Sequence, residues 1–93
     1  MPTFVVETFV SAGDRERFAR SIEDLRSAIG RGHDPHRARH VRSFVAPDDE
    51  MGFHILEAGT AADVARVTTA AGIDVERVVE VVRVDVPDTE GVR

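Results

Sequence analysis

The chain has 93 residues, a formal net charge of −5 and no cysteine, tryptophan or tyrosine. This length predicts one domain of marginal stability, which an oligomer or a His/carboxylate metal site would supplement because disulfides and thiolate metal sites are excluded. The acidic balance and the missing stacking residues argue against nucleic-acid binding. No apolar run is long enough to span a membrane, and the first residues do not resemble a signal peptide, so a cytoplasmic location is expected.

The first two predicted elements are a strand and an amphipathic helix. Residues 3–10 are apolar and β-branched, which is typical of a strand. Ser11 followed by Asp14 fits a capping box that opens a helix, and this helix should end near Gly30 or Gly32. The apolar face of the helix repeats at helical spacing through Phe18, Ile22, Leu25 and Ile29.

A hairpin and a long last strand follow. Residues 38–46 and 52–58 have strand character, and the turn-forming stretch 47–50 lies between them. Residues 77–86 are rich in valine and predict a long fourth strand.

A second helix lies between the hairpin and the last strand. Thr60 with Asp63 repeats the capping pattern, and Gly72 ends the helix. The order β-α-β-β-α-β with right-handed crossovers predicts an α+β, ferredoxin-like sandwich, with an antiparallel sheet of strand order 4-1-3-2 and both helices on one face. The domain spans 1–87 and leaves a flexible tail at 88–93.

Two helices cover one face of such a sheet, and the hairpin register predicts which residues face them. A four-residue turn places Ser43 opposite His54, a pair interpreted as packing, and His40 opposite Glu57. The helix side then contains Val41, Ser43, Val45, His54, Leu56 and Ala58. The open side contains His40, Arg42, Phe44, Phe53, Ile55 and Glu57, with Val5, Glu7 and Phe9. A five-residue turn would exchange the faces of His54 and Glu57. The apolar open side predicts a homodimer, sheet against sheet.

Ionisable residues within the strands form the first candidate site. Strands one and three are expected to run parallel, so Glu7 and Glu57 lie towards the same end of the sheet. The whole predicted cluster is Glu7, His40, Glu57 and Glu80. Carboxylates within strands need a partner, and with an imidazole they would ligate a divalent metal ion or act in acid–base chemistry. The alternative is a solvated rim in which the carboxylates pair with Arg42 and Arg83.

The remaining histidines form weaker candidates. His33 and His36 lie in a polar, arginine-rich stretch that would bind a metal, while its arginines, including Arg42, would receive an anionic ligand or a partner subunit. A solvated loop is the alternative. His54, if it faces the helices, is interpreted as a satisfied core histidine. Its predicted position is about 13 Å from that of His40, too far for one ion to bind both within a chain.

Several segments resemble a small family of unknown-function domains that includes a nickel-binding protein. The similar segments are residues 1–7, 41–58, 71–73 and 76–81. The resemblance implies a dimeric α+β barrel of ferredoxin-like domains, with nickel or another divalent metal as a ligand. Related barrels include muconolactone isomerase-like enzymes and small monooxygenases, so it also leaves room for an enzyme.

Three hypotheses follow. The first is a dimeric metal- or small-ligand-binding protein that uses His40 and the strand-end carboxylates. The second is a cofactor-independent enzyme of the dimeric barrel type, with Glu57 or His40 as the acid–base group. The third is an interaction module without chemistry. Members of the similar family often have an aromatic residue where His40 stands and a cysteine where His54 stands, so the nickel ligands are not carried over to this chain.

Overall fold

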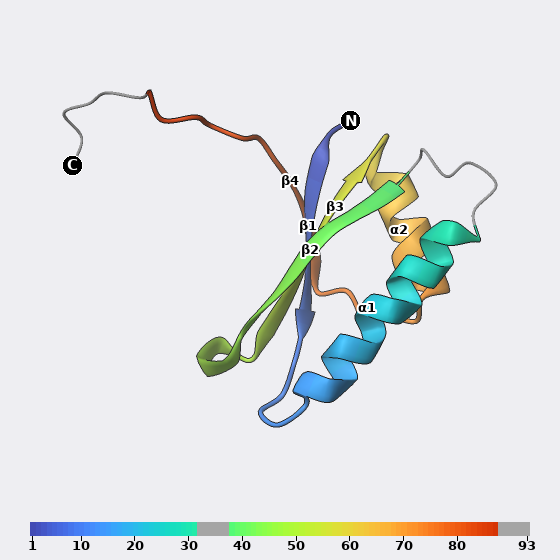
Figure 1. Ribbon diagram of the computed structural model, residues 1–93, viewed down its shortest axis with the longest axis vertical. Coiled ribbons are helices and arrows are strands. Elements are labelled where there is room, and N and C mark those ends of the chain that lie inside the picture. The colour runs from blue at the N-terminus through green and yellow to red at the C-terminus, as the bar shows by residue number, and fades with distance from the viewer. Residues whose placement is uncertain (32–37, 88–93) are drawn as a thin grey trace.

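The computed structural model describes residues 1–31 and 38–87, and within them it has the predicted β-α-β-β-α-β order (Figure 1). The elements are β1 (Thr3–Phe9), α1 (Arg15–Gly30), β2 (Ala38–Ala46), a 3₁₀ turn (Pro47–Asp49), β3 (Met51–Ala58), α2 (Ala61–Ala70) and β4 (Arg77–Val81). The sheet order is β2-β3-β1-β4, and both helices pack on one face. The predicted α+β, ferredoxin-like fold is confirmed.

Burial alternates residue by residue along the two central strands. On β1, Phe4 and Val6 are buried and face the helices, whereas Val5 and Glu7 face the open side. This is the period of a strand that has one face covered. The core beneath the helices consists of Phe4, Val6, Leu25, Ala38, Leu56, Ala58, Val64 and Val67.

The two predicted capping boxes have different outcomes. Thr60 caps α2 as predicted, because its hydroxyl accepts a hydrogen bond from the Asp63 backbone N–H at 3.1 Å. At α1 the N-cap residue is Asp14 instead of Ser11. The Ser11 hydroxyl donates to the Asp14 carboxylate at 2.9 Å, so the two side chains bond to each other and do not cap the helix.

The pairing of β1 with β3 corrects the assumption that these strands are parallel. They are antiparallel, with Thr3 opposite Glu57 and Glu7 opposite Phe53. β1 and β2 run in the same direction, and the hairpin after β2 turns β3 in the opposite direction. Residues near the C-terminal ends of β1 and β3 therefore lie at opposite ends of the sheet.

A bulge in β2 corrects half of the predicted hairpin register. The four-residue turn is confirmed, and Ser43 lies opposite His54 as predicted. Between His40 and Arg42 the register shifts by one residue, so His40 lies opposite Leu56 and not opposite Glu57. One extra residue in a strand moves the residues beyond it to the other face. His40 consequently faces the helices, and the extra residue is Val41.

The last strand is shorter than predicted. It ends at Val81, and residues 82–87 leave the sheet as an extended segment that projects from the body of the molecule (Figure 1). The predicted tail at 88–93 lies outside the described residues. No helix in the described part of the chain is long and apolar enough to cross a membrane.

Candidate functional site

The predicted carboxylate cluster does not form. Glu7 accepts hydrogen bonds from the Arg77 guanidinium at 3.0 and 3.1 Å, and Glu57 pairs with Arg39 at 2.9 Å. Both pairs lie on the open face, whereas Glu80 lies opposite Phe4 in an exposed position of β4. Across residues 1–31 and 38–87, no three His, Asp or Glu side chains are grouped so that they would hold a metal ion. The antiparallel pairing of β1 with β3 and the β2 bulge separate the four residues.

Two histidines instead converge on one serine hydroxyl, on the face beneath the helices. His40 Nε2 lies 2.8 Å from Ser43 Oγ, and the same oxygen lies 2.7 Å from His54 Nδ1. The ring centroids are 6.3 Å apart. The expectation that about 13 Å separates the two residues is therefore wrong, because the bulge turns His40 onto the face of His54.

The Arg26 contact fixes the direction of the first hydrogen bond and favours one proton arrangement in the two rings. Arg26 Nε donates to His40 Nδ1 at 3.2 Å, and a guanidinium has no acceptor. A neutral His40 then carries its proton on Nε2 and donates it to Ser43. We expect the Ser43 hydroxyl, which accepts from His40, to donate in turn to His54 Nδ1, and this would place the proton of neutral His54 on Nε2. We name this series, from Arg26 through His40 and Ser43 to His54, the His–Ser–His chain.

His54, at the inner end of the His–Ser–His chain, is buried, and one of its two ring nitrogens lacks a hydrogen-bond partner within the described part of the chain. His54 is 0% exposed, and its ring stacks on Phe18 with the centroids 4.8 Å apart. Its Nε2 is buried and has no hydrogen-bond partner among the described residues. Burial, and secondly the nearby His40, lower the pKa of His54 from 6.5 to about 4. His54 is therefore not the satisfied core histidine that the sequence suggests, and it is neutral at physiological pH.

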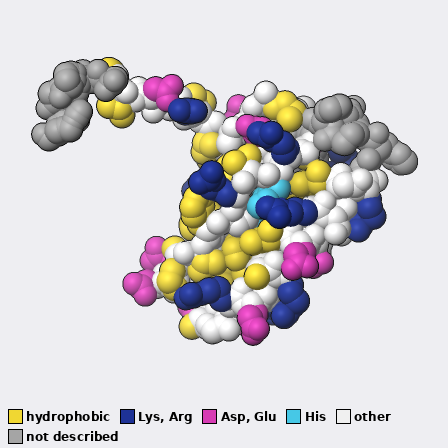
Figure 2. Space-filling model, in the orientation of Figure 1, with side chains coloured by type: hydrophobic (Ala, Val, Ile, Leu, Met, Phe, Trp, Pro, Cys, Tyr) yellow, Lys and Arg dark blue, Asp and Glu magenta, His cyan; other side chains and the backbone are white. Residues whose placement is uncertain are grey.

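His40, towards the outer end of the His–Ser–His chain, lies near the surface beside basic side chains. Burial lowers the pKa of His40, and the neighbouring Arg26 charge lowers it further, against a smaller opposing effect of a backbone hydrogen bond at Arg42. Figure 2 shows histidine flanked by Lys or Arg side chains on this face, and the sequence contains no lysine. Both imidazoles are thus held in the neutral form, which is the form that ligates metals and accepts protons.

The nitrogen atoms of the His–Ser–His chain suit a transition-metal ion better than a hard cation such as calcium or magnesium. One nitrogen of each imidazole is hydrogen-bonded to the Ser43 hydroxyl oxygen, and imidazole nitrogen suits nickel, zinc and copper. The carboxylate oxygens that calcium or magnesium need lie elsewhere, on Glu7, Glu57 and Glu80. The nitrogens of His40 and His54 are thus of the donor type that transition metals take, whereas the metal ligands predicted from the sequence lie apart.

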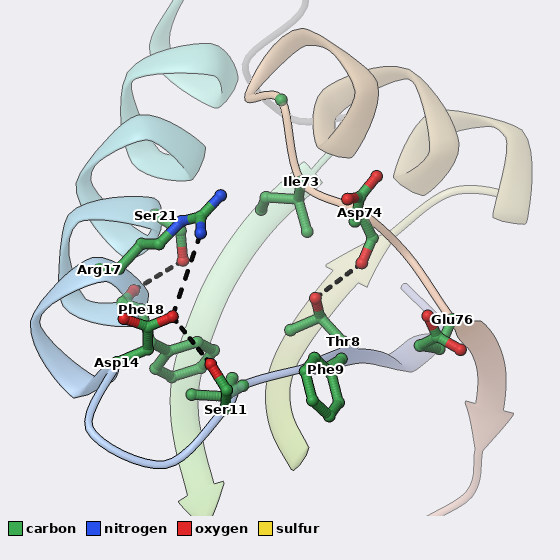
Figure 3. A pocket seen from close by; sticks show the side chains of 12 residues that line it. Thr8, Phe9, Ser11, Asp14, Arg17, Phe18, Ser21, Ile73, Asp74 and Glu76 are labelled. Carbon is green, nitrogen blue, oxygen red and sulfur yellow. Dashed lines mark hydrogen bonds and ion pairs between the residues drawn. The ribbon is translucent and has the colours of Figure 1, made fainter. Parts of the chain in front are cut away.

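A cavity of about 380 Å³ lies next to Phe18, the residue that stacks on His54 at the inner end of the His–Ser–His chain (Figure 3). It opens between the end of β1, the first half of α1 and the segment that joins α2 to β4. Phe18 lines this cavity and also stacks on His54. The remaining lining mixes apolar residues such as Phe9 and Ile73 with polar ones, among them Asp14 at the start of α1, Arg17 and Asp74. The volume is in the range of small-molecule sites.

The other predicted ligand residues do not join the His–Ser–His chain. His33 and His36 lie outside the described residues. Arg42 lies on the open face opposite Ile55, as the register predicted. Sequence reasoning missed Ser43 as the residue that links the histidines, although it predicted the pairing of Ser43 with His54. No glycine or proline marks the bulge at Val41, so no sequence signal placed His40 on this face.

The open face of the sheet keeps its predicted apolar character. The residues predicted to point there from β1 and β3 do so, and Phe9 and Phe44 are 57% and 51% exposed. Large aromatic side chains exposed to this extent on one face are typical of an interaction surface. Ion pairs Glu7–Arg77 and Arg39–Glu57 lie on the same face.

Comparison with known proteins supports the fold. A scan against models of protein families and a search of curated proteins found no match. Among solved structures, the crystal structure of SCO4226 from Streptomyces coelicolor A3(2) superposes with a TM-score of 0.74, over 89% of this chain and 99% of its own, at 14% sequence identity. A likeness at this identity carries the fold and leaves function to be argued from the site.

Proposed function

We propose that the protein is a small dimeric binding protein that holds a divalent transition-metal ion, such as nickel, between His40 and His54. The observation that carries the proposal is the convergence of both imidazoles on Ser43 Oγ, at 2.8 and 2.7 Å. Two histidines on neighbouring strands bond to the same hydroxyl oxygen through different ring nitrogens, and the pKa of each is lowered, which favours the neutral form at pH 7. Waters or a small anion near Arg26 would complete the coordination.

The low pKa values support ligation because a metal competes with protons for imidazole nitrogens. A histidine with a pKa of about 4 has no proton to release at pH 7, so binding there involves no deprotonation. Metal-ligating histidines normally donate their second ring N–H to an acceptor, which orients the ring. His54 is oriented instead by its stack on Phe18.

We propose in addition that two copies pack through their open faces. Phe9 and Phe44 are half-exposed in the single chain and would be covered in such a dimer. A two-fold arrangement places the same patch of each copy in contact, which is the commonest symmetry of homo-oligomers. The histidine pair lies on the opposite face, so metal binding and dimer formation use different surfaces.

Calorimetric titration of chelator-treated protein with nickel, zinc and cobalt tests the metal site. Wild-type protein should bind one ion per chain with micromolar or tighter affinity. The variants His40→Ala and His54→Phe should each lose this binding, while a His33→Ala/His36→Ala double variant, which leaves both ligands in place, should keep it. Binding that survives both ligand variants, or no heat with any of the ions, would reject the metal site.

An acid–base enzyme without a cofactor is the second candidate, and the cavity beside Phe18 is the observation that favours it. Glu57, one of the two predicted acid–base residues, lies on the open face and away from this cavity, so His40 and His54 remain for that role. A thermal-shift screen of small organic molecules in the presence of a chelator separates the candidates. Compounds that stabilise wild-type protein but not Phe18→Ala would favour the enzyme.

A further inference from the structure

The buried lining of the cavity beside Phe18 offers mainly apolar contact. Thr8 and Phe18 are both 7% exposed, and Val10 is 8% exposed. The Thr8 hydroxyl donates to the backbone carbonyl of Asp74 at 2.6 Å, so the polar atom of this side chain is already bonded. Ile73 adds further apolar surface. A ligand in this cavity therefore gains by burying an apolar group of its own.

The charged side chains of the cavity are mostly of one sign. They are one arginine and three carboxylates, namely Arg17, Asp14, Asp74 and Glu76. Arg17 lies 4.0 Å from Asp14, whose carboxylate also accepts a hydrogen bond from the Ser11 hydroxyl. Asp74 and Glu76 lie across the opening from Arg17, and their carboxylates have no hydrogen-bond or ion-pair partner among the described residues (Figure 3). The cavity thus keeps two unpaired carboxylates on one side.

An apolar wall beside unpaired carboxylates favours a ligand of positive charge. Like charges on a low-dielectric, concave surface raise the local concentration of ligands of the opposite charge. An anion would be repelled by Asp74 and Glu76, and a neutral molecule would gain apolar contact alone. The lining also contains the aromatic rings of Phe9 and Phe18, and the faces of such rings attract cations.

We propose that this cavity binds a small organic cation, in which an ammonium group is attached to an apolar body. The body packs against Phe18 and Ile73, and the ammonium group lies on the side of Asp74 and Glu76. The cavity volume of about 380 Å³ is at the lower end of the range of small-molecule sites, which suits a molecule with a single ring. The site contains neither histidine of the His–Ser–His chain, so it goes beyond the proposed metal site and does not depend on it.

NMR titration of the nitrogen-15-labelled full chain tests the charge of the ligand. Benzylamine, benzyl alcohol and benzoate share an aromatic ring and differ in charge at neutral pH. Benzylamine should bind with a dissociation constant of about 1 mM or lower and should shift the amide signals of Thr8, Ser21 and Ile73. Benzyl alcohol should bind at least about fivefold more weakly, and benzoate should cause no saturable shift. Added salt should weaken the binding of benzylamine, because it screens exposed charges.

The variant Asp74→Asn/Glu76→Gln keeps the shape of the cavity and removes both unpaired charges. Its dissociation constant for benzylamine should rise about fivefold or more, while that for benzyl alcohol stays the same. The matched control Glu57→Gln/Glu80→Gln makes the same change in net charge near the other end of β1, and should alter the constant less than about twofold.

Arg17→Gln provides a change of the opposite sign. It removes the one cationic side chain of the lining, so benzylamine should bind about twofold to threefold more tightly. Damage to the fold would weaken binding and cannot produce this gain.

The outcomes separate the ligand class from the cavity itself. Benzyl alcohol that binds as tightly as benzylamine, or an Asp74→Asn/Glu76→Gln protein that binds benzylamine as the wild type does, overturns the cation as the ligand. No saturable shift with any of the three probes overturns the cavity as a binding site. The calorimetric titration with metal ions is unaffected by either result, so failure of this site and failure of the metal site are distinguishable.

Discussion

The two faces of the sheet are built from the same strands but differ in how their polar groups are buried and paired. On the covered face, Leu56 and His54 are 0% exposed, and the polar groups there bond to one another through Ser43. On the open face, charges pair at the surface and aromatic rings stay half-exposed. Polar groups that are buried lose hydration and must find protein partners, whereas surface pairs lose little and contribute little. We therefore propose the covered face for specific chemistry and the open face for assembly.

Adjacent core and open-face residues on β3 provide the sharpest comparison. Leu56→Ala removes a side chain that is fully buried beneath the helices, so the free energy of unfolding should fall by about 2–5 kcal/mol. Ile55→Ala, one residue away on the open face, should reduce it by about 1 kcal/mol at concentrations where the chain is monomeric and should weaken the dimer at higher concentrations. Urea unfolding at two protein concentrations measures both effects, and equal losses for the two variants would remove the distinction between the faces.

Lowering the pH should reduce the free energy of unfolding, because His54 is buried in its neutral form on the covered face. The unfolded chain protonates this ring near pH 6.5, whereas the folded chain does so near pH 4, so the unfolded state holds more protons between these values. The stabilisation is complete above about pH 6.5 and is lost as the pH falls towards 4, with about 2 kcal/mol gone at pH 5. His40 acts in the same direction because its pKa is also lowered.

Urea unfolding at pH 7.5 and pH 5 measures this loss. The variant His54→Phe keeps a ring that stacks on Phe18 and removes the titrating group, so its stability should change less between the two pH values. A variant with the same pH dependence as the wild type would show that His54 is not buried in its neutral form.

A substitution at Gly52 tests the packing of Phe18, the ring on which His54 stacks. A Cβ at this residue would lie 2.5 Å from Phe18 Cε1 and 2.8 Å from Val10 Cγ2, so Gly52→Ala should push the Phe18 ring from its place. Such overpacking lowers stability by about 1–3 kcal/mol. Gly30→Ala is the matched control because nothing lies within 4 Å of its added Cβ. Thermal unfolding compares the two, and a Gly52→Ala protein as stable as the control would contradict the tight packing of α1 on β3.

The smallest effect should come from the ion pairs of the open face. Glu7→Gln breaks the pair with Arg77, whose side chain is 68% exposed, and should lower the free energy of unfolding by less than about 1 kcal/mol. The loss should shrink further in high salt, because salt screens exposed charges. Chemical unfolding at low and high ionic strength measures it. A loss above 2 kcal/mol that persists in salt would mean that this face is not solvated in the single chain.

The sequence predicts the fold well because each element has its own local signal. Strand alternation, the Thr60 cap and the four-residue turn are all local, and the pairing of Ser43 with His54 follows from the turn. The candidate site depended on two non-local facts. One is the antiparallel pairing of β1 with β3, which separates Glu7 from Glu57; it follows from the predicted antiparallel sheet of order 4-1-3-2, so the assumption of parallel strands conflicted with the predicted fold. The other is the bulge at Val41, which no residue of the sequence marks and which moves His40 to the covered face.

Nitrogen-15 NMR of the imidazole rings tests the shared site of His40 and His54 with the fewest assumptions. At neutral pH both rings should be neutral and carry their protons on Nε2, as the direction of the His–Ser–His chain requires. One equivalent of zinc should then shift His54 Nδ1 and displace the His40 proton from Nε2 to Nδ1, so that both rings respond together. Rings with the opposite tautomers, or zinc that perturbs other histidines and leaves these two unchanged, would contradict a metal site built on this pair.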